Sequence, residues 1–197
     1  MLTNLVKSKQ SLIFLTLCLT SYIAFVLLAL YFKPVTLANF LGFLALIAYI
    51  ATLLPSTFRT VFPNMRSNKI LVWLLKRRRH IGIISYVLAS NHGLLMIIQK
   101  NINLLSADTY IRYFQGILIL FIMSLLAITS NDWSVKGLKH NWKKLHQLTY
   151  LILLILPWHI LDKMSPSWSY LTPLELIIIF LFVYFSIKRK RLEAKSS

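Results

Sequence analysis

Residues 145–161 read LHQLTYLILLILPWHIL, an apolar run with one histidine at its start, His146, and another near its end, His159. About 20 apolar residues are enough to cross the hydrocarbon core of a membrane as a helix. Ionisable side chains are costly inside such a run, so the histidines are functional candidates by default. The stretch therefore predicts a membrane helix that carries a polar site.

Five other apolar stretches of similar length lie along the chain, which predicts an all-α membrane protein. We expect a bundle of six helices over residues 11–187, between a cytosolic tail at 1–10 and a basic cytosolic tail at 188–197. The first stretch follows two lysines, as a signal peptide does, but it is long and no small-residue cleavage site follows it, so we expect a mature helix. The six predicted spans are Ser11–Phe32, Val35–Leu54, Ile81–Ile98, Tyr113–Thr129, Leu145–Leu161 and Leu171–Ile187.

The composition supports lipid as the main solvent of this chain. Of its 197 residues 57% are hydrophobic and 14% charged, and the mean hydropathy is +0.68. A soluble domain carries about 25% charged residues. The single Cys18 excludes an internal disulfide and a Cys-ligated iron–sulfur cluster. The five glycines form neither GxGxxG nor GxxxxGK[ST], so any redox or energy input is expected from another protein.

The net charge of +17 indicates topology rather than nucleic-acid binding, because the basic residues cluster at the margins of apolar runs. With six spans, the N-terminal tail and segments 55–80, 130–144 and 188–197 share one compartment, and they hold 18 of the 22 Lys and Arg residues. The other four are Lys33, Lys100, Arg112 and Lys163. This bias predicts a multi-pass protein of the bacterial inner membrane, with both termini in the cytosol and the basic tail against anionic lipid.

The depth of the histidines suggests a paired ligand site. His92 lies 13 residues beyond Arg79, and His159 lies 13 residues beyond His146, on two spans that both run outward. At 1.5 Å per residue each is roughly 20 Å into the membrane, so both are expected at one depth. Two facing imidazoles in a helical bundle suit a bis-histidine haem. By the same arithmetic His80 and His146 share a level near the cytosolic face.

Other interpretations stay open for each histidine. A single intramembrane histidine can be a hydrogen-bonded core residue or a proton relay. His80 stands beside Arg77-Arg78-Arg79, where an interfacial polar residue needs no further role, and we expect His140 in a solvated loop. At about 100° per residue, 13 residues place His146 and His159 on different faces of a straight helix, unless Pro157 kinks it.

Several of these residues together resemble the ferric reductase-like transmembrane domain family. The similarity is strongest to the haem-binding membrane subunit of the bacterial periplasmic methionine sulfoxide reductase system. It covers about residues 40–187, and the order and spacing of weak motifs carry it. They are Arg78-Arg79 with Ile-Gly-Ile (81–83) leading to His92, Thr129-Ser130, Trp142-x-x-Leu145-His146 with Tyr150, and Pro157-x-His159.

The resemblance implies a six-helix b-haem protein that passes electrons across the membrane. The donor would be quinol or a separate cytosolic flavin reductase, and the acceptor a periplasmic molybdenum reductase. His92, His146 and His159 match the family's haem histidines. His80 departs from that subunit, where an aliphatic residue is expected, but it matches NADPH oxidases and ferric-chelate reductases, which hold two stacked haems. The resemblance thus leaves one or two haems open.

We therefore expect a membrane b-type cytochrome that relays electrons and has no substrate site of its own. His92 and His159 are the expected ligands of an outer haem between spans three and five, and His146 ligates or supports an inner one. Arg78, Arg79, Lys143 and Lys144 are candidates for holding haem propionates or the headgroup of FMN or a quinone. Two rival hypotheses are a transporter whose histidines relay protons or bind a metal ion, and a haemless scaffold of a membrane complex.

Overall fold

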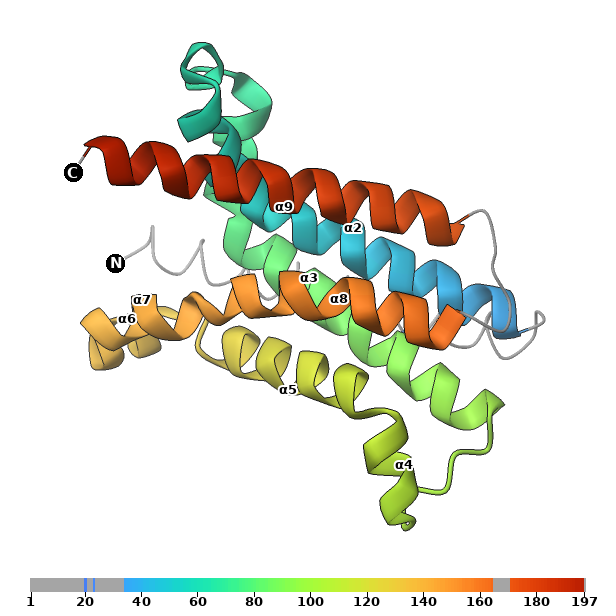
Figure 1. Ribbon diagram of the computed structural model, residues 1–197. Coiled ribbons are helices and arrows are strands. Elements are labelled where there is room, and N and C mark those ends of the chain that lie inside the picture. The colour runs from blue at the N-terminus through green and yellow to red at the C-terminus, as the bar shows by residue number, and fades with distance from the viewer. Residues whose placement is uncertain (1–19, 21–22, 24–33, 165–170, 197) are drawn as a thin grey trace.

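The computed structural model describes residues 20, 23, 34–164 and 171–196 (Figure 1). The predicted N-terminal tail and most of the first predicted span, Ser11–Phe32, lie outside the described residues. Every regular element in the described part is helical, which confirms the all-α prediction there. The longer helices are α2 (Pro34–Val61), α3 (Lys69–Gln99), α5 (Phe114–Ile128), α8 (Leu148–Met164) and α9 (Leu171–Ser196). The short elements are η1 (Pro63–Met65), α4 (Ala107–Arg112), α6 (Asp132–Leu138) and α7 (His140–His146).

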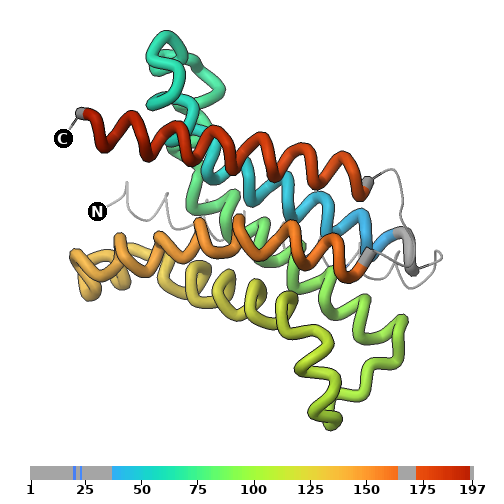
Figure 2. The backbone as a smooth tube through the Cα atoms, viewed as in Figure 1, coloured from blue at the N-terminus to red at the C-terminus, as the bar shows by residue number. Residues whose placement is uncertain are grey.

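The long helices form a bundle in which sequence neighbours are not always the packing partners. Helix α2 packs along both α3 and α9, while α8 packs against α5 and α9 (Figure 1). The tube in Figure 2 shows the basic segments around η1, α6–α7 and the C-terminal end of α9 at one end of the molecule, and α4 at the other. The described segments that were expected to share one compartment thus lie at one end.

The number of membrane spans is supported only in part. Within the described residues, Leu37–Val61, Lys69–Gln99 and His140–Lys163 are long and apolar enough to cross a membrane. A fourth candidate is the pair Phe114–Ile128 and Asp132–Leu138, which is bent by 94°. The sixth predicted span lies in α9, which is not among these candidates. The structure therefore supports three or four spans, and six remains a prediction.

Two predicted loops are largely helical. The third predicted span began at Ile81, but α3 begins at Lys69 and runs through the arginine triplet. The Asn68 side chain starts it by accepting hydrogen bonds from the backbone N–H groups of Ile70 and Leu71 at 2.9 and 3.4 Å. Lysine and arginine are good helix formers, so their charge does not end the helix. Segment 130–144 likewise holds α6 and α7, and the exposed His140 begins α7 instead of lying in a loop.

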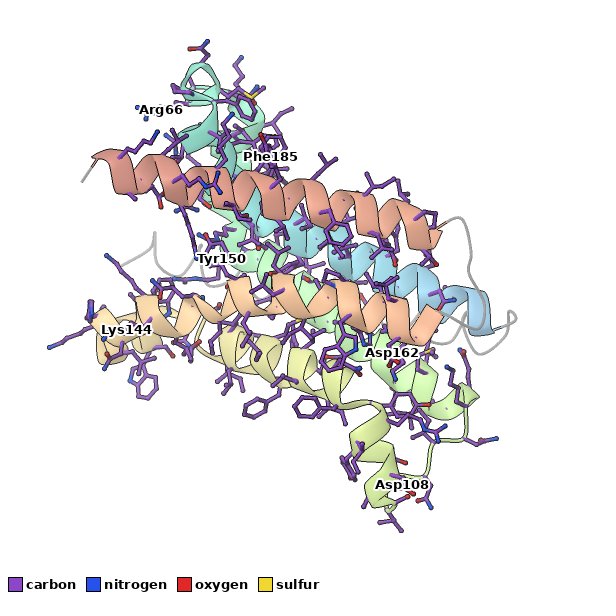
Figure 3. All side chains as sticks on the ribbon, in the orientation of Figure 1. Arg66, Asp108, Lys144, Tyr150, Asp162 and Phe185 are labelled. Atoms are coloured by element: carbon purple, nitrogen blue, oxygen red, sulfur yellow. The ribbon has the colours of Figure 1, made fainter. Side chains whose placement is uncertain are left out.

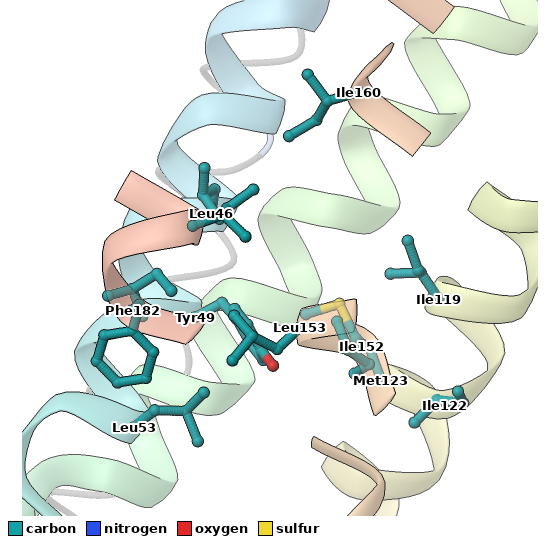
Figure 4. Packing of buried hydrophobic residues seen from close by; sticks show 12 residues of the cluster. Leu46, Tyr49, Leu53, Ile119, Ile122, Met123, Ile152, Leu153, Ile160 and Phe182 are labelled. Carbon is teal, nitrogen blue, oxygen red and sulfur yellow. The ribbon is translucent and has the colours of Figure 1, made fainter. Parts of the chain in front are cut away.

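The core lies where α2, α5, α8 and α9 meet (Figure 4). Leu53 and Ile179 are completely buried there, and Ile152 is 1% exposed. Lipid tails are as apolar as these side chains, so hydrogen bonds and close packing must hold the helices together. Ser85 of α3 donates to the Ala45 carbonyl of α2 at 2.8 Å, and Tyr49 of α2 donates to the Thr149 carbonyl of α8. These bonds position α3 and α8, the two helices that carry the paired histidines.

Candidate functional site

His92 of α3 and His159 of α8 face each other within the bundle. Their ring centroids are 6.4 Å apart and their planes cross at 89°. This contact is what the shared depth of the two residues predicts. Two imidazoles that bind one metal ion from opposite sides, each through a metal–nitrogen bond of about 2 Å, have centroids about 6 Å apart. The observed separation therefore matches a pair of axial ligands.

The backbone of α2 orients the His92 ring. Its Nδ1 atom lies 2.7 Å from the Ala38 carbonyl oxygen, which can only accept a hydrogen bond. Nδ1 therefore carries the proton, and Nε2 keeps the lone pair that a metal ion needs. Histidine ligands commonly donate their other ring N–H to such a carbonyl, which fixes the tautomer and the ring orientation. Ala38 itself is completely buried, so this support is held in place by packing.

The His159 ring is held by packing instead. Its Nδ1 atom is buried and has no hydrogen-bond partner within the described residues. Pro157 lies inside α8, which continues to Met164, whereas α7 ends at His146 and α8 begins at Leu148. Gln147 between them keeps right-handed helical dihedral angles, φ −71° and ψ −19°, so His140–Lys163 runs on as one candidate span with a one-residue interruption.

A glycine of a neighbouring helix lies against each ring. A Cβ atom on Gly42 of α2 would lie 3.2 Å from His92 Nδ1, and one on Gly116 of α5 would lie 3.1 Å from His159 Cε1. These separations are tighter than ordinary packing contacts. Four helices thus contribute to the site. Helices α3 and α8 supply the histidines, and α2 and α5 supply glycines that leave room for the rings. Sequence reasoning missed both glycines, although a glycine inside an apolar helical run is a signal of close approach.

The histidine pair lines a cavity of ≈ 530 Å³. This volume is within the range of about 300–1,000 Å³ that is typical of ligand and cofactor sites. Apolar side chains such as Leu46, Ile119 and Ile152 form much of its wall. The Lys and Arg residues on its described lining are Lys100 and Lys163, not the predicted Arg78 or Arg79. An apolar wall, two imidazoles and flanking lysines fit a haem, whose macrocycle is apolar and whose propionates are anionic.

His146 belongs to a separate cluster at the end where the basic segments gather. Its ring stacks on Trp142 at 4.1 Å between centroids, and its Nε2 atom lies 3.3 Å from Thr129 Oγ1. That hydroxyl donates to the Leu125 carbonyl at 2.7 Å, so His146 Nε2 is the donor to it. Trp142 Nε1 donates to the Thr129 carbonyl at 2.9 Å. The structure therefore does not bring His146 to the cavity of the other two histidines.

The remaining predicted site residues also lie away from that cavity. His80 is partly buried on α3, 12 residues before His92 and hence about 18 Å along the helix. Arg79 forms an ion pair with Asp132 of α6 at 2.8 Å, and side chains that are 43% and 81% exposed make such a pair weak. Arg78 interacts electrostatically with Tyr150, Arg189 and Tyr49. The predicted set thus divides into an outer histidine pair and a group at the basic end.

The contact between His146 and Thr129 allows a direct test of whether His146 ligates a haem. We expect Thr129→Val to lower the stability of the protein by about 1 kcal/mol, because it removes the acceptor of the His146 Nε2 proton and keeps the side-chain shape. The measurement is the thermal unfolding midpoint together with the visible absorption of the purified protein. Thr60→Val is the control, since Thr60 bonds only within its own helix, to the Ser56 carbonyl at 3.1 Å. An altered haem spectrum in Thr129→Val alone would show that His146 ligates a haem.

Comparisons with known proteins point to one family. The profile of the family described as ferric reductase like transmembrane component matches residues 41–157. The chain is 32% identical over 123 residues to proteins of Brucella ovis and Brucella canis, each named as the haem-binding subunit MsrQ of protein-methionine-sulfoxide reductase. The match covers 60% of this chain and 52% of each relative, so the chain spans about half the length of the curated relatives it matches. No solved structure matches significantly.

Proposed function

Because the chain belongs to the family of ferric reductase-like transmembrane components, we propose that it is a membrane b-type cytochrome that relays electrons and has no substrate site of its own. The observation that carries this proposal is the His92–His159 pair, with 6.4 Å between ring centroids. Haem b is the cofactor that two neutral imidazoles in an apolar cavity suit best. When bound, it supplies a one-electron carrier inside the membrane.

Each residue of the site has a defined task in this proposal. His92 and His159 would hold the iron, and the Ala38 carbonyl keeps His92 in the tautomer that can bind. With two histidines holding the iron, the site would favour electron transfer over reactions at the metal. Lys100 and Lys163 line the same cavity and are the nearest cations for the haem propionates. The apolar wall excludes water and lowers the local dielectric constant, which tunes the reduction potential.

The partners follow from the relatives, and they are part of the proposal. The Brucella relatives are named as haem-binding subunits of a methionine sulfoxide reductase, so we propose a periplasmic reductase of this type, containing molybdenum, as the electron acceptor. The donor is quinol or a separate flavin reductase, with FMN or a quinone as the carrier on the cytosolic side. The excess of Lys and Arg at one end supports a bacterial inner-membrane location with that end, and both termini, on the cytosolic side.

The visible spectrum of the purified protein tests the proposal against its two rivals. We expect a low-spin b-type spectrum whose bands sharpen on reduction with dithionite, because both axial positions are filled by imidazole. Elemental analysis of the same sample should find iron in proportion to haem. A haem-free protein that binds another transition metal ion would favour a metal-coupled transporter. A protein with neither haem nor metal, in a membrane with sufficient haem supply, would favour a scaffold, and either result would overturn the proposal.

The number of haems is tested by His80→Leu. We expect one haem per chain in both the natural protein and this variant, because His80 does not line the cavity of the histidine pair. Its place beside three arginines at the basic end explains a polar residue without haem ligation. The measurement is the haem-to-protein ratio from the pyridine haemochrome spectrum and amino-acid analysis. A ratio of two that falls to one in His80→Leu would show that His80 and His146 hold an inner haem.

A further inference from the structure

A second cavity lies at the basic end, between the first turn of α8 and the C-terminal half of α9. Its volume is ≈ 420 Å³, and Gln147, just before α8, and Tyr150 of α8 line it from one side. Ser186, Arg189, Lys190 and Glu193 line it from α9. Figure 3 shows Tyr150 in the space between these two helices. Unlike the haem cavity, this one has walls of hydroxyl, amide and charged groups.

The Ser186 hydroxyl indicates that a polar group belongs in this cavity. Ser186 is 6% exposed, and its Oγ atom has no hydrogen-bond partner within the described part of the chain. Serines in the other helices behave differently: Ser90 and Ser124 donate to the carbonyl four residues earlier at 2.9 and 2.8 Å. A buried hydroxyl without a partner is unfavourable. A ligand oxygen in the cavity would satisfy it.

The charges around the same cavity favour an anion. Arg189 donates through Nη1 to the Tyr150 hydroxyl at 3.0 Å and through Nε to Glu193 at 2.7 Å. The Lys190 ammonium lies 5.3 Å from the centre of the Tyr150 ring. Arg78 of α3 interacts with both Arg189 and Tyr150, and the two guanidinium groups repel each other. Arg189 and Lys190 of α9 thus both approach Tyr150, with Glu193 as the carboxylate among the lining residues.

We propose that this cavity binds a phosphate group. A phosphate offers several acceptor oxygens in different directions, which suits a hydroxyl, an amide, a guanidinium and an ammonium better than a planar carboxylate does. The basic end of the protein is also the end expected at the cytosolic headgroup layer, where anionic lipids attract Lys and Arg. The group can come from the headgroup of an anionic phospholipid or from a soluble phosphate ester. The proposal does not depend on haem binding.

The experiment uses the full-length protein, with its helical circular dichroism spectrum as the measure of correct folding. The first arm places it in lipid nanodiscs of phosphatidylcholine with increasing phosphatidylglycerol and counts retained phosphatidylglycerol by native mass spectrometry. The second arm titrates inorganic phosphate against the detergent-solubilised, delipidated protein, with chloride to keep the ionic strength constant, and follows the unfolding midpoint. Ser186→Ala and Lys190→Gln are the test variants. Arg191→Gln is the matched control, because it removes the same charge one residue later from an exposed position outside the cavity.

We expect saturable binding that Ser186→Ala and Lys190→Gln each weaken about tenfold, and that Arg191→Gln leaves within a factor of two. Saturation by one phosphatidylglycerol in the first arm identifies a lipid headgroup as the source. Saturation in the second arm alone identifies a soluble phosphate ester. Two results would overturn the proposal: no saturable binding in either arm, or equal weakening by Lys190→Gln and Arg191→Gln, which would mean that only the general charge of α9 attracts anions.

Discussion

Replacing either paired histidine should abolish the low-spin haem spectrum, and this is the largest effect that the structure predicts. In His92→Ala or His159→Ala one imidazole remains, and it cannot fill both axial positions of the iron. Loss of a supporting residue around a metal site already costs about 10–100-fold in affinity, and loss of a ligand should cost more. We therefore expect little or no haem to be retained after purification. The measurement is the haem-to-protein ratio together with the absorption spectrum of the reduced protein.

The chain offers a matched control for this experiment in His140. This histidine is exposed at the start of α7 and does not line the haem cavity. His140→Ala should keep the full haem content and the same bands. Normal low-spin haem in both His92→Ala and His159→Ala would disprove the assignment of the ligands, whatever His140→Ala shows.

The second large effect is expected from single methyl groups at Gly42 and Gly116. In Gly42→Ala or Gly116→Ala the new Cβ atom lies 3.2 or 3.1 Å from the nearest atom of the His92 or His159 imidazole, so the ring or the helix must shift. Overpacking of a tight interior typically costs about 1–3 kcal/mol. A shift of the ring would also move the nitrogen that is proposed to hold the haem iron. We expect a several-fold loss of haem or conversion to a five-coordinate, high-spin spectrum, measured by visible absorption and by electron paramagnetic resonance.

Gly82→Ala separates this effect from the general consequence of placing alanine in a membrane helix. Gly82 lies on α3, the same helix as His92, and its Cβ would meet Thr52 Cγ2 at 3.8 Å, an ordinary van der Waals contact. Alanine is more favourable than glycine inside a helix by about 1 kcal/mol. We therefore expect Gly82→Ala to keep its haem and to be slightly more stable. Equal haem contents in the three glycine variants would show that Gly42 and Gly116 do not position the ligands.

The structure also distinguishes two polar regions that the sequence grouped into one list of candidates. The histidine pair with its apolar cavity is suited to a buried electron carrier. The group at the basic end, with Tyr150, Arg189 and Lys190, lines a polar cavity and is suited to an anion. Mutations in one region should therefore leave the other intact. Haem content and phosphate binding are separate readouts of the two.

The sequence by itself determined that the chain is all-α and that His92 and His159 lie at the same depth. Hydrophobic run length predicted α5 to within one residue at each end, Tyr113–Thr129 against Phe114–Ile128. The rise per residue predicted that His92 and His159 share a depth, and they lie in ring contact. Both are local properties, because span length and depth depend only on residues that follow one another along one helix.

Other features depended on how the helices pack. Helix α3 starts at Lys69 because Asn68 caps it, and composition alone does not distinguish a capping asparagine from one in a loop. The equal spacing that paired His80 with His146 gives depth but not rotation about the helix axis, and the structure places His146 against Thr129 and Trp142. Gly42 and Gly116 gain their role from rings on other helices. The neighbours that each side chain meets are set by contacts between distant segments, so only the tertiary structure could decide them.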